Sequence, residues 1–496
     1  MANKDDSAVL QLTGRRNIYA TSDEITKDNI ISQLTQACVI HSVNLIAEDY
    51  LYWYRRGVTP ILQRTKKRNK FINNKVNESA GIADQIVTFK DGYFMTQPAT
   101  YMVRNDASQD DIDKLNEYLY RSGKHQADNK VVDWFHTVGK GVLYVEPNDD
   151  PDVPALAHAL DPRGAFVVYS LRPGNAPLYG VNMVVAEENT YFDVYTRDLV
   201  YHLKGGQVGP LNTTVPFRQA TPIELLGEPE PNRIGEVPII EYRYNSTGMG
   251  AFELSLSDLD ALDRVLSNQV DGVEQFIQSL VVTYNCEFDE GVTAETIRDA
   301  GLVPLKSTAD SKGDIKILSE QLDQEQAKVI VDHLKYQIFE SCSMPLISQH
   351  GTTYDTTGAA VMANAGWYQA DGAARNTEDL FKESNRQFDK IFTKILRQKG
   401  LLDLKPNDFE LNFVRNETAN VQAKAQAFST MVQGGIAPVL AMAKSGISND
   451  PVSDYLESKK WITMRWGDPD KPAPQPTETI IQRDSDNGEN EMGGAV

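Results

Sequence analysis

Cysteine is scarce in this chain of 496 residues, and its placement excludes two classes of small cross-linked domain. The three cysteines, Cys38, Cys286 and Cys342, are far apart, odd in number and in no C-x-x-C pair. Disulfide scaffolds and zinc knuckles need paired, closely spaced cysteines. We therefore expect reduced thiols. Cys38 and Cys342 fall on apolar helix faces, where packing in the core is a simpler role than nucleophilic catalysis.

Long uncharged apolar runs are also missing. A transmembrane helix needs about 20 consecutive apolar residues, and the sequence contains no such uncharged run. The first residues, Met1–Asp6, are acidic and polar, unlike the basic start and apolar centre of a secretory signal. We expect a soluble protein with no membrane partner.

Motifs for catalysis and metal binding are absent as well. There is no G-x-x-x-x-G-K-[ST] phosphate loop, and the nearest string is Gly139–Gly141. The seven histidines show no H-x-x-x-H or H-E-x-x-H spacing, and no G-x-S-x-G occurs. The sequence therefore predicts no catalytic residues, no metal site and no cofactor.

Positive charge is in the minority, with 49 Lys and Arg against 69 Asp and Glu and a formal net charge of −20. Affinity for DNA comes from neutralising its phosphates with basic side chains. A tight DNA binder is therefore excluded, and any DNA contact must be local or transient.

The basic run 64–70 is the strongest local exception to this acidic balance. Two interpretations stay open for it. One is a solvent-facing start of a helix, which we favour, and the other is a contact with nucleic acid or with a partner. The candidate contact residues are Lys66, Lys67, Arg68 and Lys70.

Three carboxylates, Asp258, Asp260 and Asp263, lie close together within a helical pattern. A metal-dependent nuclease holds its ions with such carboxylates. It also needs a supporting acid from a strand, and none is identifiable. We favour a solvated acidic helix face instead.

The length suggests about three domains, and the 41% hydrophobic content is that of a folded protein. Residues 1–24 are polar, and we expect them to be flexible. A helix is predicted from about Ile25, then an aromatic turn at 50–57 and a second helix over 73–90.

Residues 130–240 change character, because short β-rich pieces alternate with Gly/Pro turns. This pattern is typical of antiparallel strands and hairpins. Together with the flanking helices it predicts an α+β protein, predominantly α-helical overall. The predicted strands are 141–146, 165–169, 178–185, 191–195 and 199–203.

A long amphipathic helix is predicted over 254–282. Its apolar residues recur at spacings of three and four, which form a seam for packing against a neighbour. Asp260, Asp263 and Asp271 lie off this seam.

The residues after this helix form an unusual order of elements. A small αβ segment (284–320) is followed by a returning helix (323–341) and a polar loop (349–358), and a long helix (359–397) begins after the loop. The loop is either an ordinary helix connector or a functional element that faces a ligand.

The C-terminal part has a different pattern. A short strand at 411–414 precedes three short helices over 418–459, which Gly and Pro residues separate. The tail, 463–496, is rich in proline and then acidic, and we expect it to be disordered.

An ordered set of short motifs over about 45–460 resembles the portal (head–tail connector) proteins of tailed bacteriophages, of the siphovirus type. Each motif alone is weak, and the ordered set is specific. The family's Asn pair after the predicted strand ending at Tyr242 is Tyr244–Asn245 here, and its Ser-Gly at the last motif is Thr357–Gly358. The motifs are Tyr52–Gly57 with Pro60–Ile61, Asn73–Val76, Ile86–Tyr93, Pro98–Tyr101, Gly235–Tyr242, Leu259–Asp263 with Ser267, Val273–Phe276 and Thr357–Ala360.

The resemblance implies a portal fold and a ring of identical subunits, dodecameric in the family. Each subunit would contain the family's parts in chain order. These are a flexible N-terminus (1–24), a wing (25–252), a stem helix (253–283), a clip (284–322), a second stem helix (323–344), a tunnel loop (345–358), a long helix with further wing (359–415), a crown (416–462) and a disordered acidic tail (463–496).

The resemblance also implies a function and partners. The ring would be assembled in the host cytoplasm, sit at one capsid vertex of the virion and conduct double-stranded DNA during packaging and ejection. Terminase would dock on the clip and be replaced by a head-completion (adaptor) protein. The major capsid and scaffold proteins would meet the wing.

DNA contacts follow from the same resemblance. The acidic face with Asp260, Asp263 and Asp271 would line the channel and repel DNA, so that it slides. The tunnel loop would make polar contacts that do not read bases, through Gln349, His350, Thr352, Thr353 and Tyr354. Two alternatives remain: another structural protein of the phage head, which would not form closed rings, and a metal-dependent nuclease.

Overall fold

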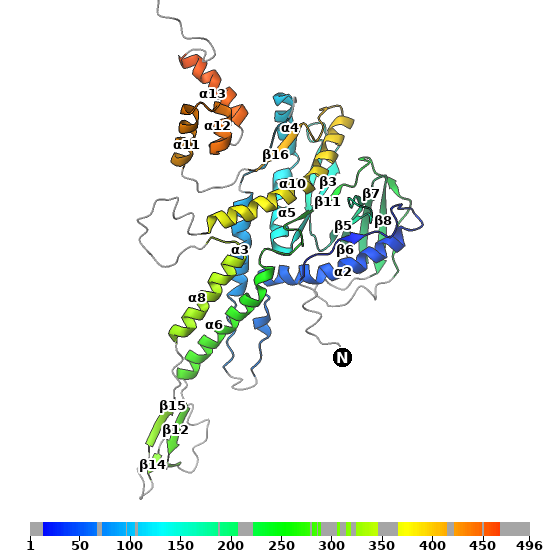
Figure 1. The fold of residues 1–496 in the computed structure, drawn as a ribbon. Coiled ribbons are helices and arrows are strands. Elements are labelled where there is room, and N and C mark those ends of the chain that lie inside the picture. The colour runs from blue at the N-terminus through cyan, green and yellow to red at the C-terminus, as the bar shows by residue number, and fades with distance from the viewer. Residues whose placement is uncertain are drawn as a thin grey trace, which may run out of the picture. The chain divides into compact units, whose positions relative to one another are not determined.

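The fold is described from a computed structural model of the chain (Figure 1). The described residues divide into two compact units, Met1–Thr418 and Ala419–Val496, and each is presented by itself. These residues are 13–66, 72–95, 97–104, 108–186, 189–206, 222–277, 280–284, 286–288, 305–307, 314–318, 324–345, 366–413, 421–448 and 451–466.

The first unit combines helices with antiparallel sheets, as the sequence predicted. Its α-helices are α2 (Ile30–Arg55), α3 (Ser79–Phe94), α4 (Gln109–Arg121), α5 (Lys124–Val138), α6 (Leu256–Ile277), α8 (Gln324–Ser341) and α10 (Trp367–Gln398). Two short 3-10 helices, η1 (Pro60–Gln63) and η3 (Glu253–Ser255), stand before α3 and α6.

The largest sheet has the order β1-β5-β6-β7-β8-β10, with β9 also on β8, and only β1 is parallel to its neighbour. A second sheet has the order β11-β3-β4, and three two-stranded ladders pair β16 with β2, β12 with β15, and β13 with β14. The strands are β1 (Ile18–Tyr19), β2 (Thr100–Val103), β3 (Lys140–Pro147), β4 (Ala155–Leu160), β5 (Ala165–Tyr169), β6 (Pro177–Ala186), β7 (Asn189–Thr196), β8 (Leu199–Gly206), β9 (Glu224–Leu225), β10 (Glu230–Pro231), β11 (Ile239–Arg243), β12 (Leu280–Tyr284), β13 (Cys286–Phe288), β14 (Leu305–Ser307), β15 (Asp314–Leu318) and β16 (Phe409–Asn412).

Helix α2 covers one face of the large sheet. Alternate residues of a strand point to the same face, so Tyr179 and Val181 of β6 meet Leu34 and Cys38 of α2 in a buried cluster. The strand predictions over 141–203 are confirmed, because period-two alternation of apolar side chains fits a sheet with one covered face.

The composition of α2 is unusually apolar. Among the described residues, it is the one helix long and apolar enough to cross a membrane by length and composition alone, which the sequence analysis did not single out. The face that includes Leu34 and Cys38 is buried in the protein's own core. An apolar composition on that face is expected for a helix that packs against a core.

The N-terminal residues correct one prediction. Residues 13–24 are part of the fold and not a flexible end: β1 pairs with β5, and Arg15 is buried in an ion pair with Glu253 at the start of α6. Gly14 has a φ of +94°, and a Cβ there would lie 2.2 Å from the Thr247 carbonyl oxygen. The polar composition of this segment suggested flexibility, but the segment is held by a buried ion pair between residues 238 positions apart, which the composition does not show.

Several predicted boundaries shift. Helix α2 starts at Ile30 and continues through the residues that were expected to form an aromatic turn, and α3 starts at Ser79 instead of at residue 73. Helix α6 ends at Ile277, and the chain forms β12 from Leu280. Residues 72–78 are not helical, because their backbone groups bond to side chains of α6, as shown below.

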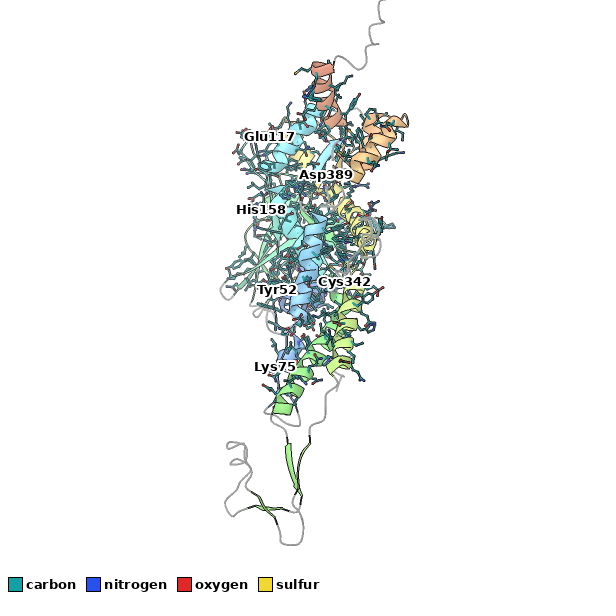
Figure 2. The ribbon with its side chains drawn as sticks, turned by 90° about the vertical axis from the view of Figure 1, so that its left-hand side faces the viewer. Tyr52, Lys75, Glu117, His158, Cys342 and Asp389 are labelled. Atoms are coloured by element: carbon teal, nitrogen blue, oxygen red, sulfur yellow. The ribbon has the colours of Figure 1, made fainter. Side chains whose placement is uncertain are left out.

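A buried polar network ties α10 to the rest of the first unit. Asn385 donates to the Tyr101 hydroxyl (2.7 Å) and to Asp389 (3.0 Å), and Tyr242 donates to the Asn385 side-chain oxygen (3.1 Å). The Tyr101 hydroxyl donates to Asp389, and Lys124 reaches Asn385 from α5. Burial raises the pKa of Asp389, labelled in Figure 2, to about 7.

The second unit is small and helical. It contains α11 (Val421–Gln433), α12 (Pro438–Ser445) and α13 (Pro451–Trp466). Three short helices were predicted in this stretch, and Gly446 with a φ of +63° ends α12 where the sequence placed a break.

Candidate functional site

Helices α6 and α8 form an antiparallel pair that we call the helix pair (Figure 1). Where it joins the rest of the unit, Leu259 and Leu262 of α6 pack with Ile338 of α8 and with Cys342, the residue after α8, in a buried cluster. Their spacing of three and four residues produces the apolar seam that the sequence predicted.

Further along the helix pair the apolar side chains are exposed. On α6 they are Val270 (41%) and Val273 (44%), and on α8 they are Val329 (66%) and Ile330 (50%). At the far end of the pair, β12 follows α6 in the chain and its ladder partner β15 precedes α8. Both helices thus leave apolar side chains uncovered within this chain, a feature common at protein–protein contacts when such side chains form one patch.

The polar side of α6 is covered by the chain itself. We call residues 64–66 and 72–78 the strap; they are the described parts of the segment between η1 and α3 (Lys75 is labelled in Figure 2). The Asn74 N–H donates to Asp271 (2.8 Å), its side-chain amide donates to Glu274 (2.7 Å), and the Val76 N–H donates to Ser267 (2.9 Å). One face of α6 therefore supplies acceptors for the backbone of the strap.

Asp263 closes the upper end of this contact. Its Oδ1 accepts the N–H groups of Glu78 and Ser79, both at 2.9 Å, and its Oδ2 accepts the Ser79 hydroxyl at 2.6 Å. The first N–H groups of a helix lack partners within the helix, and negative charge is favourable at that end. Asp263 thus caps α3 from another helix.

Asp260 and Asp271 are also engaged within the subunit. The Tyr54 hydroxyl of α2 donates to Asp260 at 2.9 Å. Arg64 lies 3.3 Å from Asp271, and Lys66 pairs with the same carboxylate. The solvated face predicted for Asp258, Asp260 and Asp263 is therefore wrong for Asp263, which is buried, and only partly right for Asp258 and Asp260, which are half-buried. Asp271 is buried as well.

The protonation of these carboxylates follows from their surroundings. Burial raises the pKa of Asp260 and of Asp263, although hydrogen bonds from Tyr54 and Ser79 oppose the rise. At Asp271 burial acts in the same direction, but hydrogen bonds from Lys66 and Asn74 outweigh it and lower the pKa.

The basic run is divided in two by its contacts. Lys66 forms an intramolecular ion pair with Asp271, so it is not a free cation for DNA in this arrangement. Lys67, Arg68 and Lys70 lie outside the described residues.

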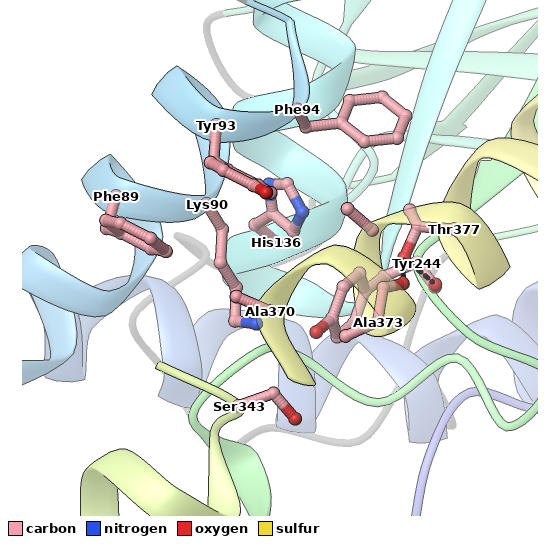
Figure 3. A pocket seen from close by; sticks show the side chains of 11 residues that line it. Phe89, Lys90, Tyr93, Phe94, His136, Tyr244, Ser343, Ala370, Ala373 and Thr377 are labelled. Carbon is pink, nitrogen blue, oxygen red and sulfur yellow. Dashed lines mark hydrogen bonds between the residues drawn. The ribbon is translucent and has the colours of Figure 1, made fainter. Parts of the chain in front are cut away.

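A small pocket lies between α3, α5 and α10, beside Ser343 just after α8 (Figure 3). Helix α3 contributes Phe89, Lys90 and Tyr93, α5 contributes His136, and the opposite wall has the small side chains of α10. Trp367, at the start of α10, lies 6.0 Å from Phe89 and 6.1 Å from Tyr93 between ring centroids. This aromatic contact fixes the point at which the chain enters α10.

Burial also sets the charge of the pocket's histidine. It holds the pKa of His136 well below its usual range, and the nearby Lys90 cation acts in the same direction. His136 Nδ1 lies 2.6 Å from Asp91, and burial raises the pKa of that carboxyl to about 8. A neutral imidazole beside a carboxyl with a raised pKa is a structural contact of the core.

The predicted tunnel-loop residues Gln349, His350, Thr352, Thr353 and Tyr354 lie outside the described residues. What is described is the two ends of their segment, at Pro345 and Gly366. Within the described ranges, no group of three or more His, Cys, Asp or Glu side chains is placed to hold a metal ion.

The strap was not predicted from the sequence. Its contacts pair side chains of α6 with backbone N–H groups of residues almost 200 positions earlier, and such contacts leave no periodic pattern. The one available signal was the spacing of Asp260, Asp263, Ser267 and Asp271, which repeats at helical intervals on one face.

Comparison with known proteins gives a consistent result. A family model described as "Phage portal protein, SPP1 Gp6-like" matches residues 38–460. The chain is 27% identical over 241 residues to the "Portal protein" of Clostridium phage phiCD119, which covers 46% of this chain and 50% of that protein. The match thus spans about half the length of this curated relative.

Proposed function

The chain belongs to the SPP1 Gp6-like phage portal family, since the family model covers most of its length, and on this premise we propose that it forms the portal ring of a phage head. The ring occupies one capsid vertex and conducts double-stranded DNA in packaging and ejection. The family is a structural one, which agrees with the absence of a catalytic motif from the sequence.

The observation that carries the proposal is the uncovered apolar surface of the helix pair. Val270 and Val273 on α6, with Val329 and Ile330 on α8, are exposed in the single subunit. Identical subunits around a closed axis cover such surfaces by packing the same helices side by side. The helix pair is then the stem of the portal, and the β12–β15 and β13–β14 ladders belong to its clip.

The strap gives this stem a fixed direction. Side chains over about three turns of α6, from Asp260 to Asp271, are bonded to α2, the strap and the start of α3. A closed ring needs every subunit to present its stem at the same angle, because a small error at each contact adds up around the ring. The buried acids of α6 thus serve ring geometry and not DNA sliding.

The remaining parts follow the family's order. We assign the α+β body of the first unit to the wing, and α11–α13 to the crown. Terminase and then a head-completion protein dock on the clip, and capsid and scaffold proteins meet the wing. Dodecameric stoichiometry and assembly in the host cytoplasm are part of the same proposal.

DNA contact is assigned to the segment between Pro345 and Gly366. Its residues Gln349, His350, Thr352, Thr353 and Tyr354 supply polar groups that bond phosphates without reading bases. The net charge of −20 on each subunit keeps DNA from adhering to the protein as a whole.

Two measurements test the proposal. Mass photometry of the purified chain is expected to show one large species at an integer multiple of 55.3 kDa, and a chain that stays monomeric at all concentrations contradicts ring formation. Deleting residues 351–356 is expected to leave that species intact and to reduce phage yield through failed packaging or genome retention. A normal phage yield would contradict a role of this segment in DNA contact.

A further inference from the structure

The described helices of the second unit, α11–α13, bury almost no apolar side chain. Among its described residues, Ala441 is the one buried hydrophobic side chain, and the four buried clusters of the chain contain no residue of α11–α13. A domain of fewer than about 50 residues is marginal even with a well-packed core. These three helices therefore need a further surface to be stable.

The missing burial is visible as exposed apolar side chains on all three helices. They include Trp461 and Leu456 on α13, Leu440 on α12 and Val432 on α11, and Met464 is 86% exposed. Burying such a side chain contributes about 1.5–3 kcal/mol each. The apolar residues that would stabilise the unit thus face outward in the single subunit.

The charges of the helical part of the unit do not oppose contact between copies. Residues 419–466 contain five Lys and Arg and three Asp and Glu, in a chain whose net charge is −20. Over 421–445 the only charged residues are Lys424 and Lys444. Residues 419–466 of two copies can therefore approach one another without the strong like-charge repulsion that a net charge of −20 imposes on the whole chain.

We propose that α11–α13 fold stably only when the same three helices of neighbouring copies cover their apolar faces. The inference rests on the proposed ring, which places identical units side by side. The C-terminal unit is then ordered by assembly, and the first unit, with its own buried clusters, is ordered before it.

Hydrogen–deuterium exchange on the full-length chain tests this inference. In wild-type rings the amides of 421–466 are expected to be protected. Leu456→Asp, at an exposed position, is expected to leave the rings formed and to lower protection over 421–466 by about 100-fold or more. The matched control is Tyr120→Asp, at an exposed residue of α4, which should leave the protection of 421–466 unchanged.

The outcomes separate the two proposals. Absence of rings in the wild type contradicts the proposed function. Rings whose 421–466 amides are equally protected with Leu456→Asp overturn the present inference alone. Equal protection in a monomeric form, such as a Val273→Asp variant that does not assemble, also overturns it, because the cover would then come from the same chain.

Discussion

At the scale of single residues, the carboxylates of α6 differ most from what their sequence spacing suggests. Asp260, Asp263 and Asp271 are spaced like a solvent-facing set, yet each accepts a hydrogen bond or an ion pair from another element. Acidic residues on a helix are therefore not by themselves evidence for a channel lining or for a metal site.

Asp263→Ala is the direct test of the cap on α3. The change leaves the buried Ser79 N–H and the partly buried Glu78 N–H without their acceptor. We expect the free energy of unfolding to fall by about 1–3 kcal/mol. Chemical denaturation measures it, and Asp258→Ala on the same helix is the control, since no side-chain hydrogen bond of Asp258 is found within the described residues. Equal loss in both variants would contradict the cap.

The raised pKa of Asp389 makes the stability of the folded chain depend on pH. Its folded pKa of about 7 lies above the ordinary 3.8, so the folded state binds more protons between these values. Stability is therefore highest at low pH within this window and is lost as pH rises toward 7, by at most about 1.4 kcal/mol per pH unit.

Asp389→Asn removes this titration and keeps an oxygen that can accept the Tyr101 hydroxyl. Between about pH 5 and 8, the melting temperature of this variant is expected to change less than that of the wild type. Differential scanning calorimetry measures both. Asp150→Asn, at an exposed position, is the control. Identical pH profiles for wild type and Asp389→Asn would refute a titrating Asp389.

At the scale of elements, periodicity was a reliable guide and long-range pairing was not. The strands of β3 and β5–β8 and the seam of α6 were predicted because burial on one face imposes a period on the sequence. The strap and the burial of Arg15 were missed because their partners are about 190 and 238 residues away. Helix α3 was extended too early for the same reason, since its true start is set by Asp263.

The helix pair supplies the prediction at this scale. Val270→Asp with Val273→Asp puts charges on a surface that we expect to be buried between subunits, where an unpaired charge is costly. Rings should be lost while the circular dichroism of the subunit is unchanged. Tyr120→Asp, on the exposed side of α4, should assemble like the wild type.

Persistent rings in the Val270→Asp, Val273→Asp double variant would place the subunit contact elsewhere. Loss of the folded subunit itself would instead show that these two valines stabilise the helix pair within one chain. The two results are separated by sedimentation and circular dichroism on the same sample.

At the scale of the whole molecule, the chain is built from parts of unequal stability. The first unit has several buried clusters and a polar network around Asn385, and the described helices of the second, α11–α13, have almost no core. Family membership came from ordered motifs over most of the chain, which one sequence can supply. The subunit contacts could not be predicted from one sequence. An apolar residue on the surface of one chain has the same sequence pattern whether it is exposed to solvent or buried against a neighbour.

Negative-stain electron microscopy of the purified full-length chain tests the central claim most directly. The account predicts closed rings of uniform subunit number with a central hole, and a narrower layer below the body where the helix pairs pack side by side. Monomers, or open and irregular polymers without a hole, would contradict it.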